Sequence, residues 1–277
     1  MKKVLLILSV AGLASCSAPV SKPVEPDIVV DGWIASGQAP VVKVTTGIIP
    51  SAEYQDIEGL SDHIMKWAKV TVSDGENSVV LFGKPDDRYF PPYIYTTGRI
   101  TGEPGKTYTL IIEYERKIVS ATTTIPEAGS LVSLRPVKDA NGKYALVAGF
   151  SIKPEEKKYY RIQTLVEGVD TEFRSSFPVT LSSDELRENA EVTIQRASTV
   201  YDITHGNRFS EGDVVHVRLC TMDENSWLFW NGIDSVIMQS LPIFVSSRNL
   251  VSNVRDGLGI WAGYGITDYT ITIRDQE

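Results

Sequence analysis

The sequence predicts a mainly β protein with two β-sandwich-like domains of the immunoglobulin or prealbumin kind, the second of which carries one amphipathic helix. Three observations lead to this prediction. Short segments with apolar residues at alternating positions recur along the chain, as in half-buried strands. Glycine, proline, aspartate and asparagine separate these segments, as in turns. A single clear stretch, near residues 222–240, shows helical spacing of its apolar residues instead.

The first domain is expected over residues 27–126. Its clearest strand is 68–73, where Val70 and Val72 alternate with polar residues before a turn at 74–77. Pro126 ends the last strand, and residues 127–130 are the best boundary between the domains. The expected strands are 27–34, 41–45, 68–73, 79–82, 107–114 and 118–125.

The second domain is expected over residues 130–277, with strands at 144–152, 158–166, 191–197, 213–219 and 269–273. Thr221 and Glu224 have the spacing of a capping box, in which the threonine side chain caps the helix and the glutamate reaches back. Apolar residues then recur at helical spacing as far as Pro242. We expect this broad apolar face to pack on the second sheet; the alternative is that it binds a partner.

Residues 1–15 have the organisation of a secretory signal peptide: Lys2 and Lys3, a short apolar run, then small residues. The apolar run has about a dozen residues, whereas a membrane-spanning helix needs roughly 20. We therefore expect this segment to be cleaved rather than to serve as an anchor.

Cys16 follows Leu13, Ala14 and Ser15, which is the pattern of the lipobox of bacterial lipoproteins. Its thiol would receive the lipid and become the first residue of the mature chain. Two or three acyl chains anchor a protein effectively permanently. Residues 16–26 contain three prolines and are expected to form an extended tether. The alternative is an ordinary secretory signal with an incidental cysteine.

The composition argues against nucleic acid as a partner. Without Lys2 and Lys3 the chain has 25 basic and 35 acidic residues, and nucleic-acid binding depends on clustered lysine and arginine. If Cys16 is acylated, Cys220 is the one remaining cysteine and no intramolecular disulfide can form. Cys220 is then interpreted as a small buried hydrophobic residue.

Motifs for catalysis, cofactors and metals are not found. The sequence has no nucleophile elbow, phosphate-binding loop or His-Glu-x-x-His zinc motif, and its three histidines are far apart. Residues 257–262 loosely match a dinucleotide fingerprint but have no βαβ context, so a tight bend is expected. We therefore predict a non-enzymatic protein with no catalytic residue, cofactor or metal site.

The most suggestive binding feature is an aromatic group around Pro91 and Pro92. An exposed aromatic cluster on a β scaffold can stack on sugars or anchor a protein interface. Burial of the same side chains against the sandwich is an equal alternative. The candidate residues are Tyr89, Phe90, Tyr93 and Tyr95.

Four segments together resemble a family of predicted outer-membrane lipoproteins of the Bacteroidetes, domain of unknown function 4249. The opening strand at 28–34 and the block at 68–74 resemble two of the family's characteristic segments. Residues 102–110 are similar to its Gly-x-Pro-Gly-x-x-Tyr-x-Leu turn and strand. Residues 252–264 resemble its C-terminal signature, in which phenylalanine is more usual than Trp261.

This resemblance implies a location and a partner. Such lipoproteins are often encoded beside TonB-dependent outer-membrane transporters, so we expect an accessory or ligand-binding partner of such a transporter in nutrient uptake. The protein would be lipid-anchored in the outer membrane, on the periplasmic face or the cell surface. The alternatives are a structural or adhesive surface lipoprotein and a hydrolase whose site is assembled from distant residues.

Overall fold

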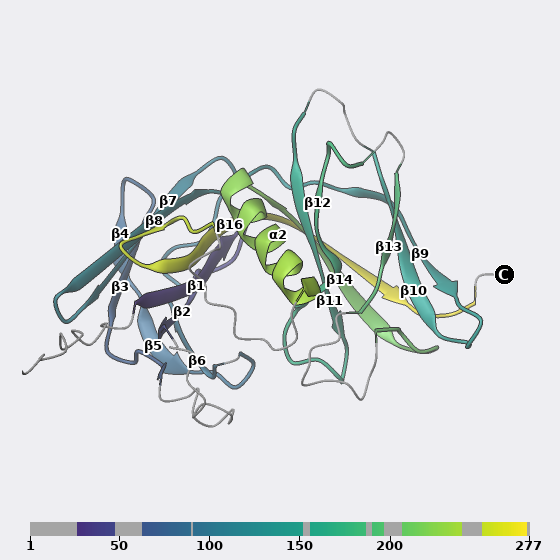
Figure 1. Ribbon diagram of the computed structural model, residues 1–277, viewed down its shortest axis with the longest axis horizontal. Helices are drawn as coiled ribbons and strands as arrows, with labels where there is room; N and C mark the ends of the chain where they lie inside the picture. Colours follow the sequence, from purple (N-terminus) through teal and green to yellow (C-terminus); the bar gives the residue numbers. More distant parts are fainter. Residues whose placement is uncertain are drawn as a thin grey trace, which may run out of the picture.

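The computed structural model describes residues 27–47, 63–89, 91–151, 156–186, 190–196, 207–239 and 251–275, without the side chains of 177–179 and 234–239. The predicted fold class is confirmed, because the described chain is mainly β and forms two sandwiches with one helix (Figure 1). The predicted signal peptide and tether lie outside the described residues.

One eight-stranded sheet extends through both sandwiches. Side chains alternate between the two faces of this sheet. In β1, Ile28, Val30 and Ile34 are buried in the first core, whereas Asp31 and Trp33 point to the other face and are half-buried. In order across the sheet, the strands are β12 (Arg174–Ser182), β11 (Tyr159–Val166), β14 (Val214–Met222), β16 (Leu258–Thr272), β1 (Ile28–Ala35), β2 (Val41–Thr46), β6 (Tyr93–Thr96) and β5 (Phe82–Pro85).

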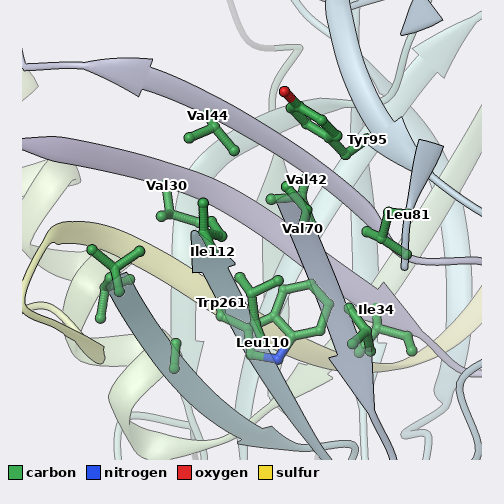
Figure 2. Close-up of a cluster of buried hydrophobic side chains, with 14 of the residues drawn as sticks. Val30, Ile34, Val42, Val44, Val70, Leu81, Tyr95, Leu110, Ile112 and Trp261 are labelled. Atoms are coloured by element: carbon green, nitrogen blue, oxygen red, sulfur yellow. The ribbon is translucent and has the colours of Figure 1, made fainter. Parts of the chain in front are cut away.

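A five-stranded sheet packs on one half of the large sheet and completes the first sandwich. Figure 2 shows Trp261 between Leu110 and Ile112 of one sheet and Val42 of the other. The strands in order are β15 (Val254–Arg255), β8 (Lys117–Thr124), β7 (Thr107–Tyr114), β3 (Lys69–Ser73) and β4 (Ser78–Val80).

A three-stranded sheet packs on the other half and completes the second sandwich. Its core joins Leu146 and Phe150 to Val217 and Leu219 of the large sheet. The strands in order are β13 (Glu191–Ile194), β10 (Tyr144–Phe150) and β9 (Leu131–Lys138). β9 contains Pro136, and an edge strand tolerates proline because one side of it has no ladder to complete.

β16 belongs to both sandwiches. Its first half pairs in parallel with β1, from Leu258 to Tyr264, and its second half pairs antiparallel with β14, from Gly265 to Thr272. Trp261 of the first half therefore lies in the first core, and Ile271 of the second half packs against the second core. The sequence predicts a first domain that ends at residue 126 and a second that begins at residue 130. In the structure, however, residues 254–264 belong to the first sandwich.

The β8–β9 connection crosses the large sheet on the same face as the two cores. Two glycines of β16 allow this close approach. A Cβ atom at Gly265 would lie 2.3 Å from the carbonyl oxygen of Pro126, and one at Gly263 would lie 2.9 Å from that of Thr124. Thr267 on the same face donates a hydrogen bond to the carbonyl of Gly129, 2.7 Å away.

The helix α2 (Glu224–Gln239) packs on the opposite face of the large sheet, against β11, β12 and β16. Figure 1 shows it between the two sandwiches. The predicted capping box is wrong: Asp223 caps the helix by accepting a hydrogen bond from the Ser226 amide at 2.8 Å. Thr221 instead lies in β14 and accepts a hydrogen bond from the Gly129 amide.

Two other predictions about strands differ from the structure. The expected strand 79–82 is two strands in different sheets, β4 and β5, with the buried Leu81 between them. The expected strand 269–273 is the end of the fifteen-residue β16. The bend predicted at 257–262 is shorter in the structure: the chain turns at Asp256 and Gly257, between β15 and β16, and residues 258–262 are already part of β16. Asp256 and Gly259 have positive φ angles.

Candidate functional site

The most chemically varied surface of the described chain lies on the face of the large sheet that carries α2. Alternating residues of β1, β2, β11, β14 and β16 point to this face, and α2 and the β11–β12 and β5–β6 connections add side chains to it. We call it the outer-face cluster. Its members are Asp31, Trp33, Lys43, Tyr89, Arg161, Glu172, Phe173, Arg218, Trp230, Tyr264 and Asp268.

Two ion pairs in the cluster lie beside aromatic rings. Lys43 Nζ is 2.5 Å from Asp31 Oδ2 and 5.6 Å from the centre of the Trp33 ring. Trp33 in turn packs against Tyr89, with ring centres 5.9 Å apart. Cations favour such positions because the faces of aromatic rings carry partial negative charge.

Arg218 makes the second pair. Its Nε and Nη2 atoms donate to the two carboxylate oxygens of Asp268 at 2.7 and 2.8 Å, which is a bidentate arrangement. The guanidinium also lies 4.0 Å from the centre of the Phe173 ring. The β11–β12 connection is therefore held over the sheet by a ring contact with β14.

Arg161 is buried in a different way. It is 8% exposed, its guanidinium lies 3.5 Å from the centre of the Trp230 ring, and it donates to the Tyr264 hydroxyl at 3.3 Å. Ser175 accepts two further hydrogen bonds from it. No described carboxylate lies within ion-pair distance of Arg161, so its positive charge acts on the cluster without a direct counter-ion.

The charges in the cluster affect each other. Burial would lower the pKa of Lys43, but the Asp31 carboxylate raises it above its usual value, and Glu172 acts in the same direction. Burial raises the pKa of Glu172, and Lys43 opposes this effect. Burial also raises the pKa of Tyr89. Perturbed groups of this kind are concentrated at functional sites.

The arrangement is suited to binding. Half-exposed rings of Trp33, Tyr89, Phe173 and Trp230 offer stacking surfaces, and the charged groups between them can orient a polar ligand or a protein segment. The rigid sheet below fixes their spacing. Elsewhere, Val166, Arg196 and Asp213 help to line a small, open depression in the surface.

The structure separates the aromatic residues proposed from the sequence. Tyr95 is buried in the first core, where its hydroxyl donates to the carbonyl of Met65 at 2.6 Å. Tyr93 packs edge-on against it, with ring centres 5.6 Å apart. Tyr89 lies in the outer-face cluster, and Phe90 is outside the described residues. The described tyrosines therefore do not form one exposed cluster.

Cys16 also lies outside the described residues, so its lipidation stays a prediction. Cys220 is confirmed as a free, buried cysteine, and burial raises its pKa to about 12. The described part of the chain has no group of three or more metal-ligating side chains. None of its helices is long and apolar enough to cross a membrane.

Most of the cluster was not found by sequence reasoning. Asp31 and Trp33 sit at the alternate positions of a strand whose other residues are fully apolar, which is a usable signal. The sequence around Glu172 and Arg161 has no comparable pattern, because only the folded sheet brings these residues near Lys43.

Solved structures give distant likenesses. The FN1–FN3 domains of chicken CNTN1 are 9% identical, with a TM-score of 0.25, and the match covers 91% of this chain and 69% of that one. A DUF4785 family protein from Legionella pneumophila is 10% identical, with a TM-score of 0.23, covering 71% and 52%. No curated protein matches the sequence.

A family model matches residues 16–270, which is nearly the whole chain. The match includes β1, β16 as far as residue 270, and the connection that crosses it. The chain belongs to the family described as Domain of unknown function (DUF4249).

Proposed function

We propose that this protein is a non-enzymatic lipoprotein of the outer membrane that serves a TonB-dependent transporter, and that the outer-face cluster contacts the transporter or a ligand on its way to it. The observation that carries the binding role is the cluster itself: four half-exposed rings and several charged groups on a rigid sheet. The signal sequence and Cys16 support the membrane location, and the family resemblance supports the transporter.

Affinity purification of the tagged protein from detergent-solubilised outer membranes tests the partnership. We expect mass spectrometry to find a TonB-dependent barrel in stoichiometric amount, and deletion of the gene to reduce uptake of one nutrient. Recovery of the protein without a transporter, together with unchanged uptake in the deletion strain, would contradict the proposal. Loss of cell contact without loss of uptake would favour the adhesive alternative.

Substitution tests the surface. Tyr89→Ala removes a half-exposed ring from a connection without opening either core, and we expect it to reduce recovery of the partner. Phe82→Ala is the matched control, because Phe82 is an exposed ring outside the cluster. Equal recovery with both variants would show that the cluster is not the contact surface.

One observation favours a second candidate, a hydrolase. Asp31 and Glu172 both act on Lys43, and the half-buried Glu172 carboxyl, whose pKa is raised, is suited to donate a proton. If the cluster is catalytic, Glu172→Gln would abolish hydrolysis of a substrate found by screening while leaving the fold intact. Activity that survives this substitution would remove this candidate.

A further inference from the structure

Trp67 is the most exposed large hydrophobic side chain of the described residues. It is 89% exposed, and Ile118 is 61% exposed. Single exposed aliphatic residues are common, but a tryptophan that contacts almost nothing in its own chain is not. Tryptophan is enriched where proteins meet the headgroup region of a membrane, because one part of its ring system is apolar and its N–H is polar.

Trp67 lies at the end of the molecule where the described chain begins. Residues 64 and 65 run beside the end of β2, where Ile64 bridges to Thr45 and the Met65 amide donates to the carbonyl of Val44. That end of β2 pairs with the start of β1, since Thr46 faces Ile28. The chain then enters β3, where Lys69 pairs with Glu113, so Trp67 lies just before the start of β3, on the side of the β7–β8 turn.

The β7–β8 hairpin and the turn between β15 and β16 reach the same end. A Cβ atom at Gly257 would lie 2.9 Å from the carbonyl oxygen of Ile28 and 3.0 Å from the Val119 side chain. Ile118 is next to Val119, and exposed basic residues are interspersed with Glu115 and Asp256. We call this the tether-end surface and define it by Lys66, Trp67, Arg116, Ile118 and Arg255.

The tether limits where this surface can go. Residues 16–26 can span at most about 40 Å when fully extended. A lipid at Cys16 would therefore hold the start of β1, and with it Trp67, near the bilayer. Linkage through a short tether gives an effective concentration of about 1 mM, so a weak contact is enough for occupancy.

We infer that the tether-end surface rests on the lipid bilayer, with the Trp67 ring in the headgroup region. The inference depends on the lipid at Cys16 that the proposed function includes. The basic side chains would lie at the level of the lipid phosphates, where lysine and arginine extend their charged ends. The outer-face cluster would remain free for its partner, because it lies on the face of the large sheet that carries α2 and not at this end of the molecule.

Fluorescence quenching tests this inference. The lipidated protein is reconstituted into phosphatidylethanolamine and phosphatidylglycerol vesicles whose acyl chains are brominated near the headgroup. We expect the quenched part of the tryptophan emission to fall roughly twofold or more in Trp67→Phe. Trp227→Phe is the control, since Trp227 packs against the helix face of the sheet and should leave the quenching unchanged.

The outcomes separate the two proposals. Mass spectrometry first measures the lipid on the protein, and a chain without lipid would overturn this inference together with the proposed anchoring. Lipidated protein with equal quenching in wild type and Trp67→Phe would overturn this inference alone. A shift of the Trp67 emission with protein concentration in detergent would also overturn this inference, because a second copy of the protein would then cover the ring.

Discussion

Trp261 is the largest side chain that the described chain buries completely. Its ring fills the centre of the first core, and its Nε1 donates to the carbonyl of Tyr108 at 3.0 Å (Figure 2). Asn253 holds its backbone through two hydrogen bonds, of 2.7 and 2.9 Å. The segment before β16 therefore helps to place this ring.

We expect Trp261→Ala to lower the free energy of unfolding by about 3–5 kcal/mol, because it leaves a cavity in a closed core. Trp261→Phe keeps most of the ring and loses one hydrogen bond, so its cost should be about 1 kcal/mol. Urea unfolding followed by circular dichroism measures both. Similar costs for the two variants would show that the ring is not the main contribution.

Glu172 gives the outer-face cluster a pH dependence. Its pKa in the folded protein is above the ordinary value of 4.5, because burial disfavours the charged form. Folding therefore favours the protonated carboxyl. The stability that this group contributes is present below its unfolded pKa and is lost as the pH rises through its folded pKa.

Glu172→Gln removes this loss, so we expect the variant to have a higher melting temperature than the wild type at pH 7. The difference should shrink towards zero as the pH falls to about 4, where the wild-type carboxyl is protonated as well. Melting curves between pH 4 and 8 measure it. A difference that does not change with pH would mean that Glu172 acts through packing rather than charge.

The helix depends on one short side chain at its start. Asp223 accepts from the Ser226 amide and from the Thr123 hydroxyl, so it joins α2 to the end of β8. We expect Asp223→Ala to reduce stability by about 1 kcal/mol, whereas Asp223→Asn keeps a good cap. Thermal unfolding compares them, and equal losses would show that charge rather than capping matters.

The crossing of β16 by the β8–β9 connection depends on glycine. We expect Gly265→Ala to cost about 1–3 kcal/mol, because the new methyl group would lie 2.3 Å from the Pro126 carbonyl oxygen and force the chains apart. Gly98→Ala is the control, since no atom lies within 4 Å of its Cβ position. Chemical unfolding of both variants checks this, and equal stability would contradict a close crossing.

Sequence reasoning finds most elements because alternation is a local signal. The strands around Val70 and Val72, and around residues 107–124, are placed almost to the residue. It misses β6, β9 and β12, whose neighbourhoods contain prolines that read as turns. It names Tyr89, which the structure places in the outer-face cluster, but not Glu172 or Arg161. The proximity of these two residues to Lys43 depends on the order of five strands, from β11 to β2.

The two sandwiches share one sheet, and this has a consequence for cooperativity. The first core needs Val254 and Trp261 from the far end of the sequence, and β1 needs β16 as its neighbour. We expect a fragment of residues 27–126 to remain unfolded, although the sequence pattern presents it as a domain. Circular dichroism and amide exchange measure this. A folded fragment would show that the C-terminal strands are dispensable.

The full chain should accordingly unfold in one transition. A substitution in the second core, such as Leu219→Ala, should then lower the midpoint for both halves of the protein. Calorimetry combined with the fluorescence of Trp261 tests this. Two separate transitions would mean that β16 holds each sandwich independently.

The parallel pairing of β1 with β16 also has a mechanical meaning. If Cys16 is held in a membrane and the second sandwich is pulled by a moving partner, tension enters β1 at Ile28 and leaves along β16 beyond Gly265. The two strands would then slide lengthwise past each other, and the hydrogen bonds from Val29 to Ala35 would share the load. The central sheet would thus resist extension as a shear joint rather than open like a zipper.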